Sequence, residues 1–193
     1  MTTPTAAPAL SARERLLDAA AELFYQEGVH VGVDALCRAA GISKRSMYLH
    51  FDSKDEVVAA SLRRKATDYT NALLPPDDER PARERILHVF HALEQIAEDP
   101  QYRGCPYVSA AMELKSPRHP ASEVARHQKD RLTAFFQREA ERGHAHDPAL
   151  LARQLTVVFD GSGAWGVVQA RGLDGLATST AQTLLDAAGL RAD

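Results

Sequence analysis

The sequence contains little cysteine and no long apolar run. Its two cysteines, Cys37 and Cys105, lie far apart and neither belongs to a C-x-x-C pair, so neither a disulfide framework nor a zinc ribbon is indicated. No stretch approaches the roughly 20 apolar residues that a membrane-spanning helix requires. Residues 1–10 lack the basic start and the apolar core of a signal peptide. We therefore expect a cytoplasmic protein with a flexible N-terminal arm at residues 1–10.

An excess of positive charge is also absent, since the net charge of the chain is −3. This balance argues against a protein that coats nucleic acid through bulk charge. Bases are nevertheless concentrated between positions 43 and 65, where six bases and three acids give a net charge of +3. The six are Lys44, Arg45, Lys54, Arg63, Arg64 and Lys65. Any contact with DNA must therefore be local.

Apolar residues recur at helical spacing along most of the chain, whereas the signals for strands are weak. The β-branched run at residues 29–33 is short and is interrupted by Gly32. We expect an all-α protein of about nine helices, with a domain joint near Pro75-Pro76. The expected helices cover residues 11–27, 33–40, a short segment after Ser43, 53–74, 81–98, a short segment from Pro106, 120–142, 147–171 and 173–188.

Start and stop signals are clearest in the first three of these helices. Ser11 and Glu14 have the spacing of a capping box, and Gly28 is expected to end the first helix in a left-handed conformation. Gly41 ends the second helix, and Ser43 caps the third almost at once. Two short helices joined by such a tight turn can place the second one in the major groove of DNA.

The turn and its surroundings contain a distinctive set of residues, which are Gly28, Leu36, Ala39-Ala40-Gly41-Ile42-Ser43, Tyr48-Leu49-His50-Phe51 and Ser53-Lys54. Together these residues resemble the DNA-binding domain of the TetR family of transcriptional regulators. The resemblance is dense from Ser11 to Asn71 and looser over the remainder.

The resemblance implies a helix-turn-helix DNA-binding domain at residues 11–71 and a C-terminal ligand-binding and dimerisation domain at residues 72–193. It implies a homodimeric repressor that binds a palindromic operator in double-stranded DNA and is released by a small-molecule effector. The second of the two short helices would carry the DNA contacts, which are Ser43 at its N-terminus, Lys44, Arg45 and Ser46 toward the groove, and Tyr48, His50 and Lys54 toward the phosphates or sugars.

The sequence departs from the family pattern at two places. Val31-Gly32 stands where the family commonly has hydroxyl residues that cap the second helix and contact phosphate. Arg45 stands where the family often has glycine, which places a bulky cation at the groove. We therefore expect DNA binding with a base preference particular to this protein.

Apolar and small residues on the last two expected helices favour close contact with a second copy of the chain. The expected interface residues are Leu151, Leu155, Val158, Phe159, Ser162, Gly166, Leu184 and Leu185, with Leu150, Gly161, Gly163, Ala164 and Leu176 beside them. The middle helices hold candidates for an effector pocket. These are Phe90, His91, Tyr102, Cys105, Met112, Phe135, Phe136 and Trp165.

Cys105 allows two interpretations. It lies between Gly104 and Pro106, where a helix N-terminus would favour the thiolate and allow the detection of electrophiles or oxidants. The alternative is a small buried apolar residue without a redox role.

Other chemistry-bearing patterns are incomplete. His88, His91 and Glu94 or Gln95 fall on one helix face, but no H-E-x-x-H motif accompanies them. The glycines at residues 161–166 lack the third spacing of a dinucleotide loop and a preceding strand. We therefore expect no enzyme activity, no cofactor and no metal. The alternative to a DNA-binding regulator is a helical interaction module without a DNA role.

Overall fold

The computed structural model describes residues 10–190. All of the regular secondary structure within that range is helical. The expected N-terminal arm lies outside the described residues apart from Leu10. The nine helices of the described part are α1 (Ala12–Glu27), α2 (Val33–Ala40), α3 (Lys44–Tyr48), α4 (Lys54–Leu73), α5 (Ala82–Ala97), α6 (Pro106–Leu114), α7 (Pro120–Arg142), α8 (Pro148–Gln169) and α9 (Leu176–Ala187). The expected all-α fold is confirmed.

The helix ends follow the capping signals closely. Ser11 and Glu14 form the full capping box, and the hydroxyl of Ser43 accepts the N–H of Ser46 at 3.0 Å. Gly41 has the left-handed conformation, with φ 62° and ψ 40°. Gly28 ends α1 with a positive φ of 94°, as expected, but its ψ of 167° lies outside the left-handed helical region.

The last helix begins later than expected, at Leu176 instead of Leu173. Asp174 and Gly175 both have positive φ, so the chain turns there before the helix starts. Leu173 is buried beneath this turn, which explains why it continued the apolar pattern of the helix.

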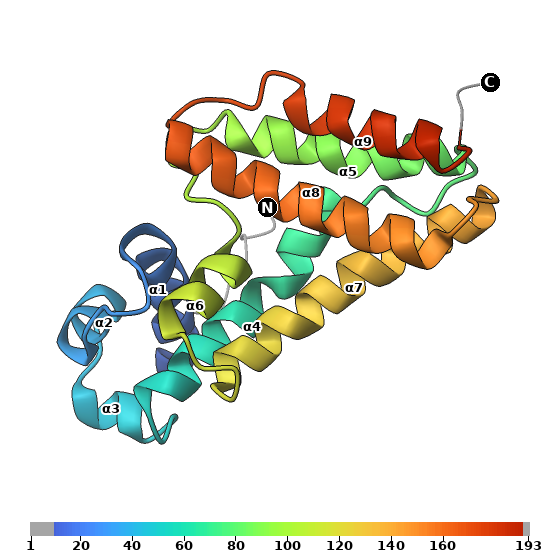
Figure 1. The fold of residues 1–193 in the computed structure, drawn as a ribbon. Helices are drawn as coiled ribbons and strands as arrows, with labels where there is room; N and C mark the ends of the chain where they lie inside the picture. Colours follow the sequence, from blue (N-terminus) through green and yellow to red (C-terminus); the bar gives the residue numbers. More distant parts are fainter. Residues whose placement is uncertain (1–9, 191–193) are drawn as a thin grey trace, which may run out of the picture.

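The helices form a small unit and a larger one that share α4 (Figure 1). α1, α2 and α3 pack on one another at one end of the molecule, and α1 also packs on α4. α4 then continues along α7, α7 packs on α8, and α9 lies against both α5 and α8. Within residues 10–190, none of the helices is both long enough and apolar enough to cross a bilayer.

Two clusters of buried apolar side chains lie beneath these units. The first gathers α1, α2, α3 and the start of α4, but also includes Tyr107 of α6 and Val124 of α7. The second gathers the side chains of α5, α8, α9 and the C-terminal half of α7. Tyr69 of α4 packs against both clusters. The domain boundary at residues 71 and 72 stays a prediction, and α6 and the start of α7 pack with the N-terminal cluster.

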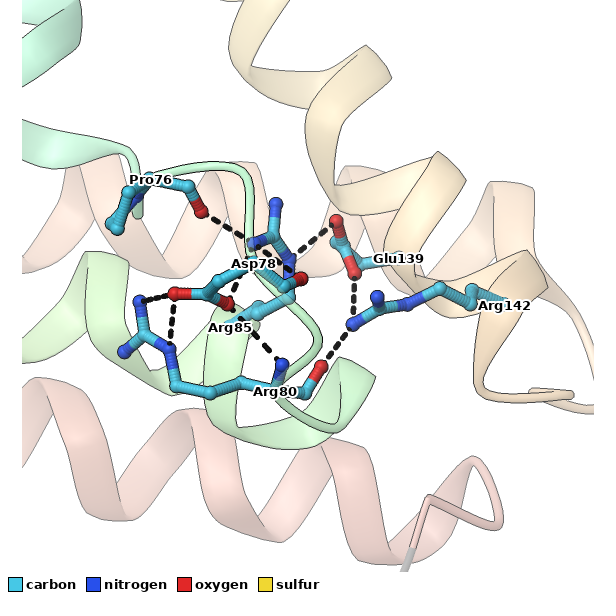
Figure 2. Close-up of polar contacts among 6 residues, drawn as sticks. All are labelled: Pro76, Asp78, Arg80, Arg85, Glu139 and Arg142. Carbon is cyan, nitrogen blue, oxygen red and sulfur yellow. Dashed lines mark hydrogen bonds and ion pairs between the residues drawn. The ribbon is translucent and has the colours of Figure 1, made fainter.

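A group of charged residues fastens the loop between α4 and α5 to α7 (Figure 2). The guanidinium of Arg85 donates to Glu139 Oε1 at 3.0 Å, to the carbonyl of Pro76 at 2.6 Å and to Asp78 Oδ1 at 3.1 Å. Arg142 lies 3.0 Å from the other oxygen of Glu139. The side chains of Arg85 and Glu139 are buried, so their charges need each other as partners.

Candidate nucleic-acid interface

α3 is held by one side chain that points into the first cluster. Met47 is fully buried beneath α3, and Phe51 just after the helix is 3% exposed. Because an α-helix turns by 100° per residue, the inward position of Met47 directs Arg45 to the opposite side of α3, away from the cluster. Ser43, Lys44, Arg45, Tyr48 and His50 are exposed, whereas Ser46 is half-buried. The structure thus brings most of the expected DNA-binding residues together on one exposed face.

Leu49 belongs to the same face and was missed by the sequence reasoning. Its side chain is 75% exposed, beside Tyr48 at 53%. An exposed leucine at this place can contact a thymine methyl group or a sugar. The exposure of Leu49 could have been predicted from the inward positions of Met47 and Phe51, because they leave position 49 on the outside.

Lys44 is paired within the chain. Its ammonium lies 2.8 Å from Asp34 Oδ1 of α2, and this hydrogen bond raises the pKa of Lys44. Both side chains are largely exposed, so the pair is weak and can open toward a phosphate or a base. Asp34 was also missed, and it reduces the positive charge that Lys44 presents.

Lys54 lies behind the helix-turn-helix and contacts main-chain atoms. Its ammonium donates to the carbonyls of Val29 at 2.7 Å and Val31 at 3.0 Å. The expected phosphate contact of Lys54 stays a prediction. In this structure the lysine fastens α4 to the α1–α2 loop (residues 28–32).

The same loop is held from its other side by α6. Oε2 of Glu113 accepts the N–H of Val29 at 2.8 Å. A Cβ on Gly28 would lie 2.5 Å from this oxygen, and the φ of 94° already favours glycine. The loop therefore receives a carboxylate from α6 and an ammonium from α4.

The departure at Val31-Gly32 has a structural counterpart. Val31 is 5% exposed and packs in the first cluster, and Gly32 precedes α2 without a side-chain cap. α2 therefore begins with main-chain N–H groups that no hydroxyl of the cap residue satisfies. Such groups can donate to a phosphate.

Part of the basic window is occupied by contacts within the chain. Arg64 forms two hydrogen bonds with Asp18 of α1, at 2.7 and 3.1 Å, which also lower the pKa of Asp18. Together with the contacts of Lys44 and Lys54, these bonds engage three of the six bases. Arg45 is exposed, and no ion pair involves it within the described residues.

Comparison with known proteins decides the family. The model of the bacterial regulatory proteins of the tetR family matches residues 16–61. The crystal structure of a TetR transcriptional regulator from Streptomyces avermitilis is 54% identical, with a TM-score of 0.91 over 94% of this chain and 100% of that chain. The chain belongs to the TetR family.

More distant relatives agree with this assignment. The HTH-type transcriptional regulator YjdC of Escherichia coli K12 is 22% identical over 152 residues, which are 77% of this chain and 80% of YjdC. The uncharacterized regulator TtgW of Pseudomonas putida is 41% identical over 63 residues, which are 32% of this chain and 47% of TtgW. This TetR protein is a DNA-binding transcriptional regulator and not an enzyme. TetR regulators bind operator DNA and act as dimers.

The expected dimer residues need correction, because most of them are buried inside the chain itself. Leu151, Leu155, Phe159 and Leu185 are at most 1% exposed, and Gly166 is buried. The remaining three are half-buried, namely Val158, Ser162 and Leu184. α8 is apolar on both faces, so its sequence did not show which face points inward.

The expected effector-pocket residues do not gather at one cavity. Phe90, Phe135 and Phe136 pack together in the second cluster, with ring centroids 5.7 Å apart in the Phe90–Phe136 and Phe135–Phe136 pairs. Met112 is 70% exposed on α6, and His91 is exposed on α5. The three phenylalanines fill the core instead of lining a cavity, because aromatic side chains serve either purpose equally well. Met112 lines a separate cavity between α6 and α7, and its role, like that of His91, stays a prediction.

The other three members have separate positions. The guanidinium carbon of Arg171 lies over the ring of Trp165, 4.8 Å from the ring centroid. Cys105 is 8% exposed and is the N-cap residue of α6, as its neighbours Gly104 and Pro106 suggested. A redox role for Cys105 stays a prediction. Tyr102 lines a cavity of about 400 Å³ between α1, α4, α5 and α6.

Proposed function

We propose that this TetR protein is a repressor that binds a palindromic operator as a homodimer and is released by a small-molecule effector. The observation that supports DNA binding most directly is the exposed face of α3 opposite the buried Met47. This face carries cationic, hydroxyl and aromatic side chains on a helix that its own N-cap fixes.

Within this proposal the side chains of α3 have different roles. Arg45 has a side chain long enough to enter the major groove, where two of its N–H groups can donate to O6 and N7 of a guanine. Lys44 and Ser46 contact the neighbouring groove edge, while Tyr48 and His50 donate to phosphates or sugars. Ser43 orients the helix N-terminus, and Lys54 contacts a phosphate through the third proton of its ammonium.

A second copy of the chain would cover the exposed face of α8 and α9. Exposed residues follow one another at helical spacing on α8, from Leu150 through Val157, Gly161 and Ala164 to Val168. Val157 and Val168 are 71% and 78% exposed. Leu176 and Thr180 continue this surface on α9. Such small and apolar residues allow two helices to approach closely, and the two-fold axis would place two copies of α3 on the two operator half-sites.

The dimer face can be tested separately from DNA binding. Val157→Arg should shift the protein toward monomer in sedimentation velocity at micromolar concentration, because each dimer would bury two unpaired cations. Ala134→Arg, at an exposed position of α7, is the matched control and should stay dimeric. A Val157→Arg protein that sediments like the wild type would contradict the proposed face.

The central experiment is a fluorescence anisotropy titration with DNA from the region upstream of the gene for this chain. Arg45→Ala should weaken binding by about tenfold or more, since a bidentate base contact contributes roughly 1–3 kcal/mol of discrimination. Arg138→Ala removes an exposed arginine of α7 and should change nothing. Equal affinities of the wild type, Arg45→Ala and Arg138→Ala would contradict the proposed role of α3.

Release requires an effector that binds the DNA-free conformation better than the operator-bound one. Repression is checked with a reporter gene behind the same upstream DNA. Deleting the gene for this chain should raise reporter expression. A fall in expression after deletion would identify an activator instead.

A further inference from the structure

We propose that the effector site is the cavity between α1, α4, α5 and the start of α6, and that it takes an uncharged aromatic molecule with a hydrogen-bond acceptor. This inference rests on the proposed release by a small molecule. The cavity has a volume of about 400 Å³, which is within the range of sites for drug-sized ligands. We call it the tyrosine cavity, after its lining residues Tyr25, Tyr69, Tyr102 and Tyr107.

The walls of the tyrosine cavity do not suit a charged ligand. Between the tyrosines they carry apolar side chains such as Leu62, Leu93 and Ile96. The charged residues that line the cavity are exposed, and they are two acids and one base, Glu22, Asp68 and Lys65. A charged group that entered would therefore lose its hydration without gaining a buried partner.

The tyrosines themselves indicate the same environment. Burial raises the pKa of Tyr69, Tyr102 and Tyr107 above the ordinary value of a phenol. A site that disfavours phenolate also disfavours other ions, so the buried part of the ligand is uncharged.

The arrangement of the rings favours an aromatic ligand. Tyr69 and Tyr107 meet edge to face, with ring centroids 5.2 Å apart and an interplanar angle of 70°. Two rings at this angle offer a further flat molecule one face and one edge, which are the contacts that aromatic pairs prefer. An aliphatic ligand would fill the same volume without using this geometry.

The tyrosine hydroxyl groups indicate that the ligand carries a hydrogen-bond acceptor. Tyr107 donates its hydroxyl proton to the carbonyl of Leu62 at 3.2 Å, so this donor is already used. The hydroxyl oxygen of Tyr25 accepts the N–H of Arg103 at 2.9 Å. The hydroxyl proton of Tyr25 has no acceptor within the described residues. Tyr25 can therefore donate to a carbonyl, ether or hydroxyl oxygen of the ligand.

The position of the cavity explains how a ligand would reach the DNA-binding face. Tyr25 belongs to α1, whereas Pro106 and Tyr107 belong to the first turn of α6. The last turn of α6 holds the α1–α2 loop through Glu113 and the N–H of Val29. A molecule that separates α6 from α1 would therefore move this loop, and α2 and α3 with it. The operator would then compete with the ligand for the conformation of the protein.

The probe for this inference is prodan, an uncharged naphthyl ketone whose fluorescence shifts in apolar surroundings. We expect saturable binding of one prodan per chain to the DNA-free protein. Anilinonaphthalene sulfonate carries a similar ring system with a negative charge, and its dissociation constant should be at least tenfold higher. Equal affinities for the two dyes would overturn the chemical class that we propose.

Two tryptophan substitutions on α5 locate the binding site. Ile96→Trp fills the tyrosine cavity and should raise the dissociation constant of prodan at least tenfold. Leu87→Trp is the matched control, because Leu87 is also half-buried on α5 but does not line the cavity, and the constant should stay within twofold. Equal effects of the two substitutions would overturn the site.

A milder variant guards against a folding defect in Ile96→Trp. Tyr25→Phe removes one oxygen without adding volume and should weaken prodan binding about threefold or more, with an unchanged circular dichroism spectrum. Unchanged prodan affinity in Tyr25→Phe would overturn the assignment of Tyr25 as the donor.

Operator titrations with and without saturating prodan test the coupling. Prodan should weaken operator binding of the wild type at least fivefold, and Glu113→Ala should reduce this effect below twofold while it still binds prodan. Unchanged operator affinity in the presence of bound prodan would overturn the effector site. Failure of the wild type to bind its operator without any dye would instead overturn the proposed function, so the two failures are distinguishable.

Discussion

The α1–α2 loop and the α4–α5 loop are both fastened by charged side chains, but the contacts differ in kind. At the α1–α2 loop, Lys54 and Glu113 bind main-chain carbonyl and N–H groups. At the α4–α5 loop, Arg85 combines two main-chain carbonyls with two carboxylates, and Glu139 is buried with it (Figure 2). The contacts at the α1–α2 loop use backbone groups of the loop. The contacts at the α4–α5 loop depend in addition on the charged side chains of Asp78 and Glu139.

The largest effect is expected at the buried ion pair. Glu139→Leu should lower the free energy of unfolding by about 3–4 kcal/mol, because it leaves the guanidinium of Arg85 buried without its main partner. Urea unfolding followed by circular dichroism measures this loss. The double variant Arg85→Met/Glu139→Leu should recover most of it, since no buried charge is left alone. A double variant as unstable as the single one would show that the pair acts through packing.

The next effect concerns the backbone at Gly28. Gly28→Ala should cost about 2–3 kcal/mol, because its φ and ψ lie in a region used almost only by glycine and the new Cβ would displace Glu113. Thermal unfolding measures the loss. Gly32→Ala is the matched control, since a Cβ there meets no atom within 4 Å, and it should leave stability nearly unchanged. Equal losses in the two variants would contradict the close approach of Glu113.

A smaller effect separates the two roles of Lys54. Lys54→Met should lower the free energy of unfolding by roughly 1.5 kcal/mol, because two carbonyls lose a charged donor. Operator binding measured at several salt concentrations gives the second readout. If Lys54 also contacts a phosphate, the slope of log affinity against log salt falls by about 0.9 in magnitude. An unchanged slope would restrict Lys54 to holding the loop.

The smallest effect is expected at Asp78, which is more exposed than Arg85. Hydrogen bonds from Arg80 hold the pKa of the Asp78 carboxyl at about 2, below its ordinary value of 3.8. The folded protein therefore keeps this charge at a pH where the unfolded chain is already protonated. Its contribution is present above about pH 4 and is lost as the pH falls toward 2. Asp78→Asn should be less stable than the wild type at pH 7, and the difference should shrink over that range in acid unfolding curves.

The sequence predicted the helix-turn-helix well because its signals are local. Gly41 and Ser43 end one helix and begin the next within three residues, and each acts on its own neighbourhood. The burial of Met47 and the outward direction of Arg45 then follow from helical spacing. The same reasoning could not show that Lys54 contacts the loop, because its partners lie 23 and 25 residues away.

The C-terminal half was predictable in its helices but not in its surfaces. α8 carries apolar residues on both faces, so Leu155 and Val157 look alike in sequence although one is buried and the other exposed. Arg85 and Glu139 are 54 residues apart, and only the packing of α5 on α7 brings them together. The tyrosine cavity likewise depends on four helices, which explains why only Tyr102 of its four tyrosines was among the expected pocket residues.

The contacts of Lys54 and Glu113 also have a consequence for the evolution of DNA specificity. Because both side chains form hydrogen bonds with main-chain groups of Val29 and Val31, these contacts do not depend on which side chains α3 presents to the operator. Mutations at Arg45 or Tyr48 can therefore change the preferred operator while the connection to α4 and α6 persists. A chimera that exchanges only residues 43–50 for those of another family member should acquire a new operator and keep its old response to effector.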